Sequence, residues 1–337
     1  MKKNLTLLFV AVVVLFSCTS NEKGFFGEDH ILIPEVKEQT SIEPKLILPT
    51  DTLTTVGSIV AFNDGIIAKA SSDCKGKVFS VYDSKGKHLG AFGTVGHAND
   101  EIVPGTVMVG QYDAHTLCLN SVNTAELKFV DVDKSLKEGR CIVTRTVPTA
   151  PRVINAFCLD DSTLLFEQET PGNYQLCERK IGSSEEKSQD MYRRVKDAFD
   201  TYRSFMAVNR NRKILVSAMQ WLNQVNFTKL DGDSIYCKSV SLYADAQTPI
   251  EDEDKQMNYY TGITTTSKYV YALYMNQSRE EAFDKEQPTE IHVFDWDGNF
   301  VKKLVANEYL YSITVNANDN AIYARDMEGN VYRYELK

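Results

Sequence analysis

Side chains that bind metals or move protons are sparse in this chain of 337 residues. It has five histidines, and only His97 lies in a long polar stretch beside acids, Asp100 and Glu101. One imidazole with nearby carboxylates is a weak metal site, because catalytic zinc takes three protein ligands. We therefore expect no metal and no cofactor. The remaining acidic runs are interpreted as solvated charge.

Motifs for nucleophilic or nucleotide chemistry are absent from the sequence. It contains no G-x-S-x-G elbow, no H-E-x-x-H helix, no phosphate-binding loop and no dinucleotide fingerprint. No catalytic residue is predicted. What remains are aromatic rings and arginines in or near polar segments, which are usual in the recognition of proteins, peptides and glycans. The candidate ligand-binding residues are His97, Glu101, Arg203, Trp221, Tyr260 and Arg279.

The N-terminus has the pattern of a lipoprotein signal peptide. Lys2 and Lys3 precede an apolar run from Leu5 to Phe16 that is too short to cross a bilayer. A leucine three positions before Cys18 and a serine directly before it form the box that lipoprotein signal peptidase cleaves. We predict that residues 1–17 are removed and that Cys18 carries a lipid. A secretory signal with ordinary cleavage close by is the alternative.

The mature chain is acidic and begins with a polar segment. The formal net charge of −9 becomes −11 when Lys2 and Lys3 leave with the signal peptide. Such a surface repels nucleic acid and anionic lipid, so we exclude nucleic acid and expect membrane contact through the lipid only. Residues 18–43 contain glycines and prolines and are predicted to be a tether. The six remaining cysteines form no C-x-x-C pair and are interpreted mostly as small buried apolar residues.

A unit of about fifty residues recurs six times from residue 44 onward. Each unit has two apolar β runs around a tight turn, followed by a second hairpin. In one such hairpin Asp297-Gly298 supplies the positive φ that a tight turn requires. The first turns of the units stand at Asn63-Asp64-Gly65, Asp113-Ala114-His115, Asp160-Asp161-Ser162, Asn209-Arg210-Asn211, Ser267-Lys268 and Asn318-Asp319-Asn320.

Six units of four strands predict an all-β fold over residues 44–337, a six-bladed β-propeller with four-stranded antiparallel blades. The last unit has only three strands, so we expect residues 44–49 to supply the fourth and to close the ring. Two separate β-sandwich domains are the alternative. They do not explain an even period.

The mature chain resembles the TolB-like six-bladed propeller lipoproteins of Bacteroides-type bacteria. The likeness rests on the box ending at Cys18, on residues 92–96 followed by Glu101 and Pro104, and on residues 291–299. The second segment departs from the Gly-Arg-Gly-Pro-Gly-Glu that is frequent in that family. Because most members have no assigned activity, the resemblance implies fold and location more than function.

The two faces of such a ring are expected to differ in loop length. The connections between blades, and those between second and third strands, include the long segments 93–105, 183–202, 244–259 and 276–289. We expect turns of two to five residues on the opposite face, and we place the ligand site on the long-loop face. Two structures are possible within 183–202. Either a helix starts at the capping-box pair Ser183 and Glu186, or residues 187–192 form a strand and a helix starts after it.

Two functions follow from these expectations. The first is a monomeric lipoprotein, anchored to the outer membrane and facing the periplasm or the outside, that binds an envelope protein, peptide or glycan without catalysis. The alternative is a metal-dependent hydrolase or lyase, similar to lactonase propellers, with its site at the channel mouth. Such an enzyme needs several converging His, Asp, Glu or Asn side chains, whereas a binding protein does not.

Overall fold

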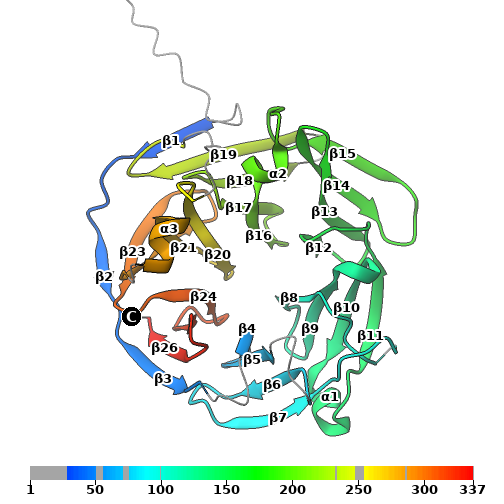
Figure 1. Cartoon of the computed structure of the whole chain (residues 1–337). Helices are drawn as coiled ribbons and strands as arrows, with labels where there is room; N and C mark the ends of the chain where they lie inside the picture. Colours follow the sequence, from blue (N-terminus) through cyan, green and yellow to red (C-terminus); the bar gives the residue numbers. More distant parts are fainter. Residues whose placement is uncertain are drawn as a thin grey trace, which may run out of the picture.

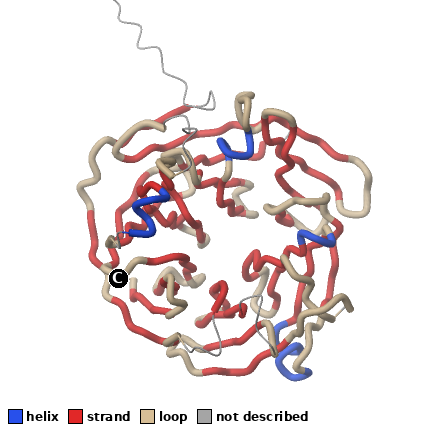
Figure 2. The backbone as a smooth tube through the Cα atoms, viewed as in Figure 1, coloured by secondary structure: helices blue, strands red, loops and turns tan. Residues whose placement is uncertain are grey.

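The repeats fold as six β-sheets arranged in a ring, as predicted (Figure 1). This computed structural model describes residues 29–50, 56–70, 76–98, 100–231, 234–246, 254–284 and 287–336. Strands make up most of the regular structure of the described chain, and its few helices are short (Figure 2). Cys18 and the predicted signal peptide lie outside the described residues.

The first three blades each take four consecutive antiparallel strands, ordered from the ring centre outward. Blade 1 consists of β4 (Val56–Phe62), β5 (Gly65–Ala70), β6 (Phe79–Tyr82) and β7 (His88–Phe92). Blade 2 consists of β8 (Thr106–Gln111), β9 (Thr116–Ser121), β10 (Glu126–Asp131) and β11 (Val143–Pro148), with the 3-10 helix η1 (Val122–Thr124) and helix α1 (Val132–Glu138). Blade 3 consists of β12 (Ala156–Cys158), β13 (Thr163–Thr170), β14 (Asn173–Lys180) and β15 (Glu186–Asp190).

The last three blades also take strands from the N-terminal end of the described chain. Blade 4 consists of β16 (Ser204–Asn209), β17 (Ile214–Met219), β18 (Val225–Asp231) and β19 (Ser234–Leu242), with β1 (Asp29–Ile33) outside them. Blade 5 consists of β20 (Met257–Thr265), β21 (Tyr269–Ser278), β22 (Thr289–Asp295) and β23 (Phe300–Ala306), with β2 (Gln39–Ser41) outside. Blade 6 consists of β24 (Leu310–Val315), β25 (Ala321–Asp326), β26 (Val331–Glu335) and β3 (Pro44–Leu48).

Ring closure by the N-terminal strand is confirmed. Strand β3 pairs antiparallel with β26 and becomes the fourth strand of blade 6. A bulge at Ile47 turns that side chain into the core shared with blade 1. The β6–β7 turn packs on the same point: a side chain at Gly86 would bring its Cβ to 2.2 Å from the carbonyl oxygen of Ile47. One blade thereby takes strands from the N-terminal and the C-terminal parts of the described chain.

The predicted tether over 18–43 is wrong for its second half. Strands β1 and β2 add parallel to the outer edges of β19 and β23, so residues 29–48 form a belt around blades 4, 5 and 6 (Figure 1). The belt was missed because edge pairing uses the backbone and needs few apolar side chains. Ile31-Leu32-Ile33 was the available sequence signal, although Ile31 and Leu32 remain partly exposed. Such pairing covers two edges that would otherwise be open.

Every pair of neighbouring blades shares its own apolar core. Clusters of buried residues join blades 1 and 2, 2 and 3, 3 and 4, 4 and 5, 5 and 6, and 6 and 1. Buried Cys118, Cys158 and Cys177 belong to these strands, which confirms the interpretation for them. Cys141 is buried outside a strand and Cys237 is half-buried. The ring is thus rigid because each sheet is packed on both faces.

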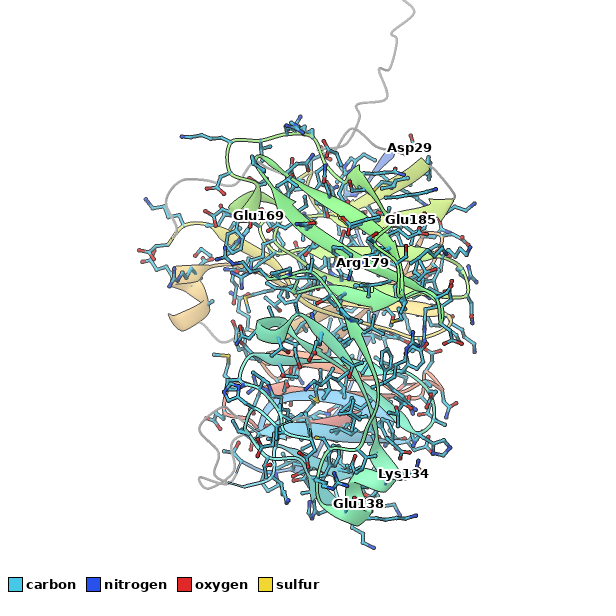
Figure 3. The ribbon with its side chains drawn as sticks, turned by 90° about the vertical axis from the view of Figure 1, so that its right-hand side faces the viewer. Asp29, Lys134, Glu138, Glu169, Arg179 and Glu185 are labelled. Atoms are coloured by element: carbon cyan, nitrogen blue, oxygen red, sulfur yellow. The ribbon has the colours of Figure 1, made fainter. Side chains whose placement is uncertain are left out.

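Figure 3 shows the ring from the side, with Glu169 near the long-loop face and Glu185 and Asp29 toward the opposite, short-turn face. The expectation of uniformly short turns there is wrong for blade 2, because α1 lies between β10 and β11. Asp131 caps α1 by accepting a hydrogen bond from the backbone N–H of Lys134. On the long-loop face, β15 followed by helix α2 (Ala198–Tyr202) matches the strand-then-helix alternative.

Neighbouring residues of β3 provide a test of the closing strand. Ile47 is 9% exposed and Leu46 is 49% exposed. We expect Ile47→Asp to lower the free energy of unfolding by about 3 kcal/mol or more, because a carboxylate would enter an apolar core. Leu46→Asp should change it by less than about 0.5 kcal/mol. Urea unfolding measures both, and equal effects would contradict this closure.

Candidate functional site

The inner strands of all six blades end around one cavity on the short-turn face. Its volume is about 1030 Å³, and its wall is built from the last residues of each inner strand and the turn that follows. Blades 2 and 4 give the longest stretches, residues 108–114 and 206–212. None of the six candidate ligand-binding residues lines it. This cavity therefore opens opposite to the face chosen from loop length.

One arginine of the cavity wall reaches past a whole blade. Arg210 follows β16 in blade 4, and its Nη2 donates a hydrogen bond of 2.7 Å to the carbonyl oxygen of Tyr112 in blade 2. Its guanidinium carbon lies 4.1 Å from the centre of the Tyr112 ring. Blade 3 stands between them in sequence order, but its inner strand β12 has only three residues. Because β12 is short, the Arg210 side chain can cross blade 3 and reach Tyr112 of blade 2.

Tyr112 is itself fixed by its neighbours. Its ring meets Phe129 edge-on at 4.7 Å between centroids, and its hydroxyl donates to Asp161 of blade 3 at 3.4 Å. Burial raises the pKa of Tyr112, while the nearby Arg210 acts in the opposite direction. The phenol is therefore neutral at physiological pH. A neutral ring under a guanidinium gives a cation–π contact.

The formal charges of the cavity wall are Arg210, Arg212 and Asp113. Asp113 caps its own turn by accepting a hydrogen bond of 2.9 Å from the backbone N–H of His115. Arg212 is exposed and lies 3.8 Å from Asp297 of blade 5. Within the described parts of the chain, Arg210 has no carboxylate within ion-pair distance. The cavity therefore presents one partly buried positive charge without a counter-charge.

A buried cluster of ionisable side chains joins blades 4 and 5. His292 is fully buried, with Nδ1 3.2 Å from the Tyr260 hydroxyl and Nε2 3.2 Å from Glu290. Glu290 also accepts hydrogen bonds from Tyr243 at 2.7 Å and from Lys303 at 2.8 Å. Burial alone would raise the pKa of Glu290, but these hydrogen bonds outweigh it and lower the pKa to about 2. Burial lowers the pKa of His292.

The belt crosses this cluster on its way between blades 4 and 5. The backbone N–H of Tyr243 donates to the Ile33 carbonyl at 2.8 Å, and that of Lys303 donates to the Glu38 carbonyl at 3.1 Å. Tyr260 is fully buried within it, so its prediction as a ligand-binding residue is wrong. Tyr260 follows a polar segment in sequence but stands inside β20, whose pleat directs it to the interface core.

A second buried carboxyl, Glu167, lies in β13. Its Oε1 accepts a hydrogen bond of 2.6 Å from Asn155, while its buried Oε2 has no hydrogen-bond partner within the described residues. Burial raises the pKa of Glu167 to about 7. A carboxyl with that pKa can exchange a proton near neutral pH. Glu167 does not line the cavity. We therefore infer that its buried carboxylate lowers the stability of the fold and takes no part in binding.

The segment that contains His97 and Glu101 is a self-contained loop. His97 is exposed. The carboxylate of Glu101 accepts a hydrogen bond of 2.9 Å from the backbone N–H of Ala98, and it fills the space above Gly96, where a Cβ would lie 1.9 Å from Glu101 Oε2. Glu101 therefore stabilises its own loop. These contacts of its carboxylate are with residues of that loop and not with another candidate.

The other three candidates lie on the long-loop side of blades 4 and 5, where the backbone N–H of Gln220, next to Trp221, donates to the Arg203 carbonyl at 2.8 Å. Arg203 is exposed at the C-terminal end of α2. Trp221 is half-buried between β17 and β18, and its carbonyl oxygen accepts a hydrogen bond of 3.4 Å from Gln256. Arg279 is exposed at the start of helix α3 (Arg279–Asp284) in blade 5. Trp221 and Arg279 belong to blades 4 and 5, whereas His97 and Glu101 lie between blades 1 and 2, so the use of all candidates in one site stays a prediction.

Arg210 and Tyr112 were missed by reasoning from sequence. They are 98 residues apart, and Asn209-Arg210-Asn211 reads as a polar turn of the repeat. Their positions next to the first turns of units two and four were the available signal, because these turns share one face of a propeller.

Over the described residues, no three His, Cys, Asp or Glu side chains converge as metal ligands. Across the same ranges, no helix has the length and apolar character to pass through a bilayer.

The two buried carboxyls give opposite pH dependences. Glu290 has a folded pKa below its unfolded value, so its stabilisation is present above about pH 4.5 and is lost as the pH falls toward 2. Glu167 has a folded pKa above its unfolded value, so stability is lost as the pH rises from about 4.5 to 7. We expect Glu290→Gln to be less stable than the native chain at pH 7, with a gap that narrows in acid. Glu167→Gln should match the native chain near pH 4.5 and exceed it at pH 8.

Urea unfolding midpoints of the native chain and both variants between pH 3 and pH 8 measure these differences. Parallel pH curves for the three proteins would refute the assigned environments.

Comparison with known proteins agrees with this architecture. Residues 59–318 match the family described as TolB-like 6-blade propeller-like. A member of the DUF4221 family from Bacteroides vulgatus is similar in structure, with a TM-score of 0.61, 13% identity, and coverage of 88% of this chain and 98% of that one. A putative exported protein from Bacteroides fragilis is similar with a TM-score of 0.56, 10% identity, and coverage of 91% and 99%. No curated protein matches the chain. The chain belongs to the TolB-like six-bladed propeller family.

Proposed function

We propose that this protein is a lipid-anchored binding propeller of the cell envelope, and that it binds an envelope protein, peptide or glycan without catalysis. The observation that carries the proposal is the cavity of about 1030 Å³ on the short-turn face, which all six blades line. Its volume is at the upper end of those found for small-molecule and cofactor sites. Its wall is a mixture of apolar and neutral polar side chains around the single uncompensated Arg210.

The short-turn mouth is favoured over the long-loop face because the binding surface there is already assembled. Hydrogen bonds between blades hold its rim: Thr314 accepts from the Ala61 N–H at 2.8 Å, and Gln111 accepts from the Asn63 N–H at 2.9 Å. A preformed site loses less conformational freedom on binding. The long-loop candidates, in contrast, do not line this cavity.

The proposed location rests on the N-terminal pattern and on one relative. The Bacteroides fragilis protein is described as exported. Ten residues lie between Cys18 and Asp29, which limits the connection to about 40 Å. Asp29 starts β1 toward the short-turn side of blade 4 (Figure 3). A lipid on Cys18 would therefore keep the cavity mouth close to the membrane and to partners at its surface, with the protein acting as a monomer.

The anchor is tested by Cys18→Ala. We expect this variant to lose the mass of the attached lipid and to move from the membrane fraction to the soluble envelope fraction. Cys237→Ala, which changes a half-buried cysteine of the ring, should stay in the membrane fraction. Mass spectrometry of the N-terminal peptide, with cell fractionation, reads out both. A soluble native chain without lipid would contradict the anchor.

The binding face is tested by bulky residues at the two mouths. Ala114 and Ala317 are exposed on the cavity rim, and Ala98 is exposed in the loop of the long-loop face. A partner isolated from envelope extract and purified should bind Ala114→Trp/Ala317→Trp at least about tenfold more weakly than the native chain, because the rings narrow the mouth. Ala98→Trp should bind like the native chain.

Biolayer interferometry with the purified partner provides the affinities, and thermal melts show that each variant is folded. The reverse pattern, with binding lost only in Ala98→Trp, would move the site to the long-loop face.

A further inference from the structure

We propose that Arg210 is a carboxylate-binding residue and that the cavity accepts the C-terminal end of a peptide chain. The inference rests on the proposed function, because it specifies the ligand of that same cavity. It depends on three observations: the donors left on Arg210, the charge of the cavity wall, and the character of the walls around it.

The guanidinium of Arg210 is held in place with donors to spare. A guanidinium has five N–H donors, and the contact with the Tyr112 carbonyl at 2.7 Å uses Nη2. The face of the group rests on the Tyr112 ring at 4.1 Å. Two contacts of different kind, one in the plane and one on the face, fix its orientation. An oriented fork of N–H donors matches the two oxygens of a carboxylate.

The charge of Arg210 lacks an acid partner in the part of the wall that the structure describes. Asp113 of the same wall accepts a hydrogen bond from the His115 N–H within its own turn. Asp161 of blade 3 lies 3.6 Å from Arg145, whose Nη2 also donates to the Asp161 carbonyl at 2.8 Å. Asp161 is therefore already engaged with another arginine. A partly buried cation without a counter-charge costs free energy in the empty protein, and an arriving anion recovers that cost.

The rest of the wall favours a peptide over a sugar acid. Ala61, Val109 and Ile313 give apolar surface from blades 1, 2 and 6. The aromatic rings of the wall are already occupied. Tyr112 is covered by Arg210, Trp296 is 1% exposed with its N–H donated to Thr266, and Phe157 packs on the core of blades 3 and 4. Sugar rings usually bind on open aromatic faces, whereas apolar walls suit a short side chain next to a terminal carboxylate.

The experiment uses two libraries of acetylated hexapeptides that differ only in their C-termini, one with free carboxylates and one with amides. Each library is passed over the immobilised mature chain, and retained peptides are counted by mass spectrometry. We expect the native chain to enrich free-acid peptides at least about tenfold over amides. Arg210→Gln should lose this preference, and Arg210→Lys should keep part of it, because it retains charge without the fork.

Arg152→Gln is the matched control, since it removes an exposed arginine that does not line the cavity, and it should behave as the native chain. Thermal melts show that each variant is folded. Equal retention of acids and amides, an unchanged preference in Arg210→Gln, or no retention of either library would overturn the proposal. So would tighter binding of glucuronate than of the selected peptides in calorimetry. None of these results decides whether the cavity is a binding site, because the Ala114→Trp/Ala317→Trp variant tests that separately.

Discussion

The pairing of β3 with β26 is the interaction on which the rest of this ring depends. Six blades packed face to face would still leave the first and last free to separate, unless one sheet takes strands from both ends of the chain. Blade 6 does so, and the side chain of Asn330 and the carbonyl of Glu328 also accept hydrogen bonds from Thr50, each at 2.7 Å. The belt extends this closure along the outer edges of blades 5 and 4.

Closure fixes the geometry of the cavity mouth. Because each blade interface has its own apolar core, the inner strands cannot move independently, and their ends meet at set distances on the short-turn face. Within that frame one irregularity has a large effect. The three-residue β12 interrupts the wall at blade 3, and Arg210 spans the interruption to Tyr112. The Arg210 guanidinium is thus held in the cavity wall at a defined point.

The fold was accessible from the sequence because its signals are local and repeated. Turns such as Asp297-Gly298 and the apolar runs that flank them recur at an even interval, and the shortage of one strand near Leu310 identified the closing segment. The belt was less accessible, since parallel edge strands are held mainly by backbone hydrogen bonds. The polar composition of the segment therefore predicts a tether, although part of it forms edge strands.

The site was harder to predict for a different reason. Arg210 and Tyr112 come together through the curvature of the ring, and nothing within either turn indicates the other. Tyr260 shows the opposite error: a polar neighbourhood in sequence suggested exposure, but the pleat of β20 buries the ring beside His292. Loop length indicated where variation is tolerated, whereas the cavity lies where the short turns hold the inner strands together.

Hydrogen exchange followed by mass spectrometry tests the central claim, ring closure by the N-terminal strand, most directly. In the intact chain, amides of residues 45–48 and of 331–335 should exchange together, and as slowly as those of the buried strands β5 and β25, because opening β3 requires opening the ring. Rapid exchange in 45–48 beside protected β25 would mean that β3 is a loosely held end, and would contradict the account.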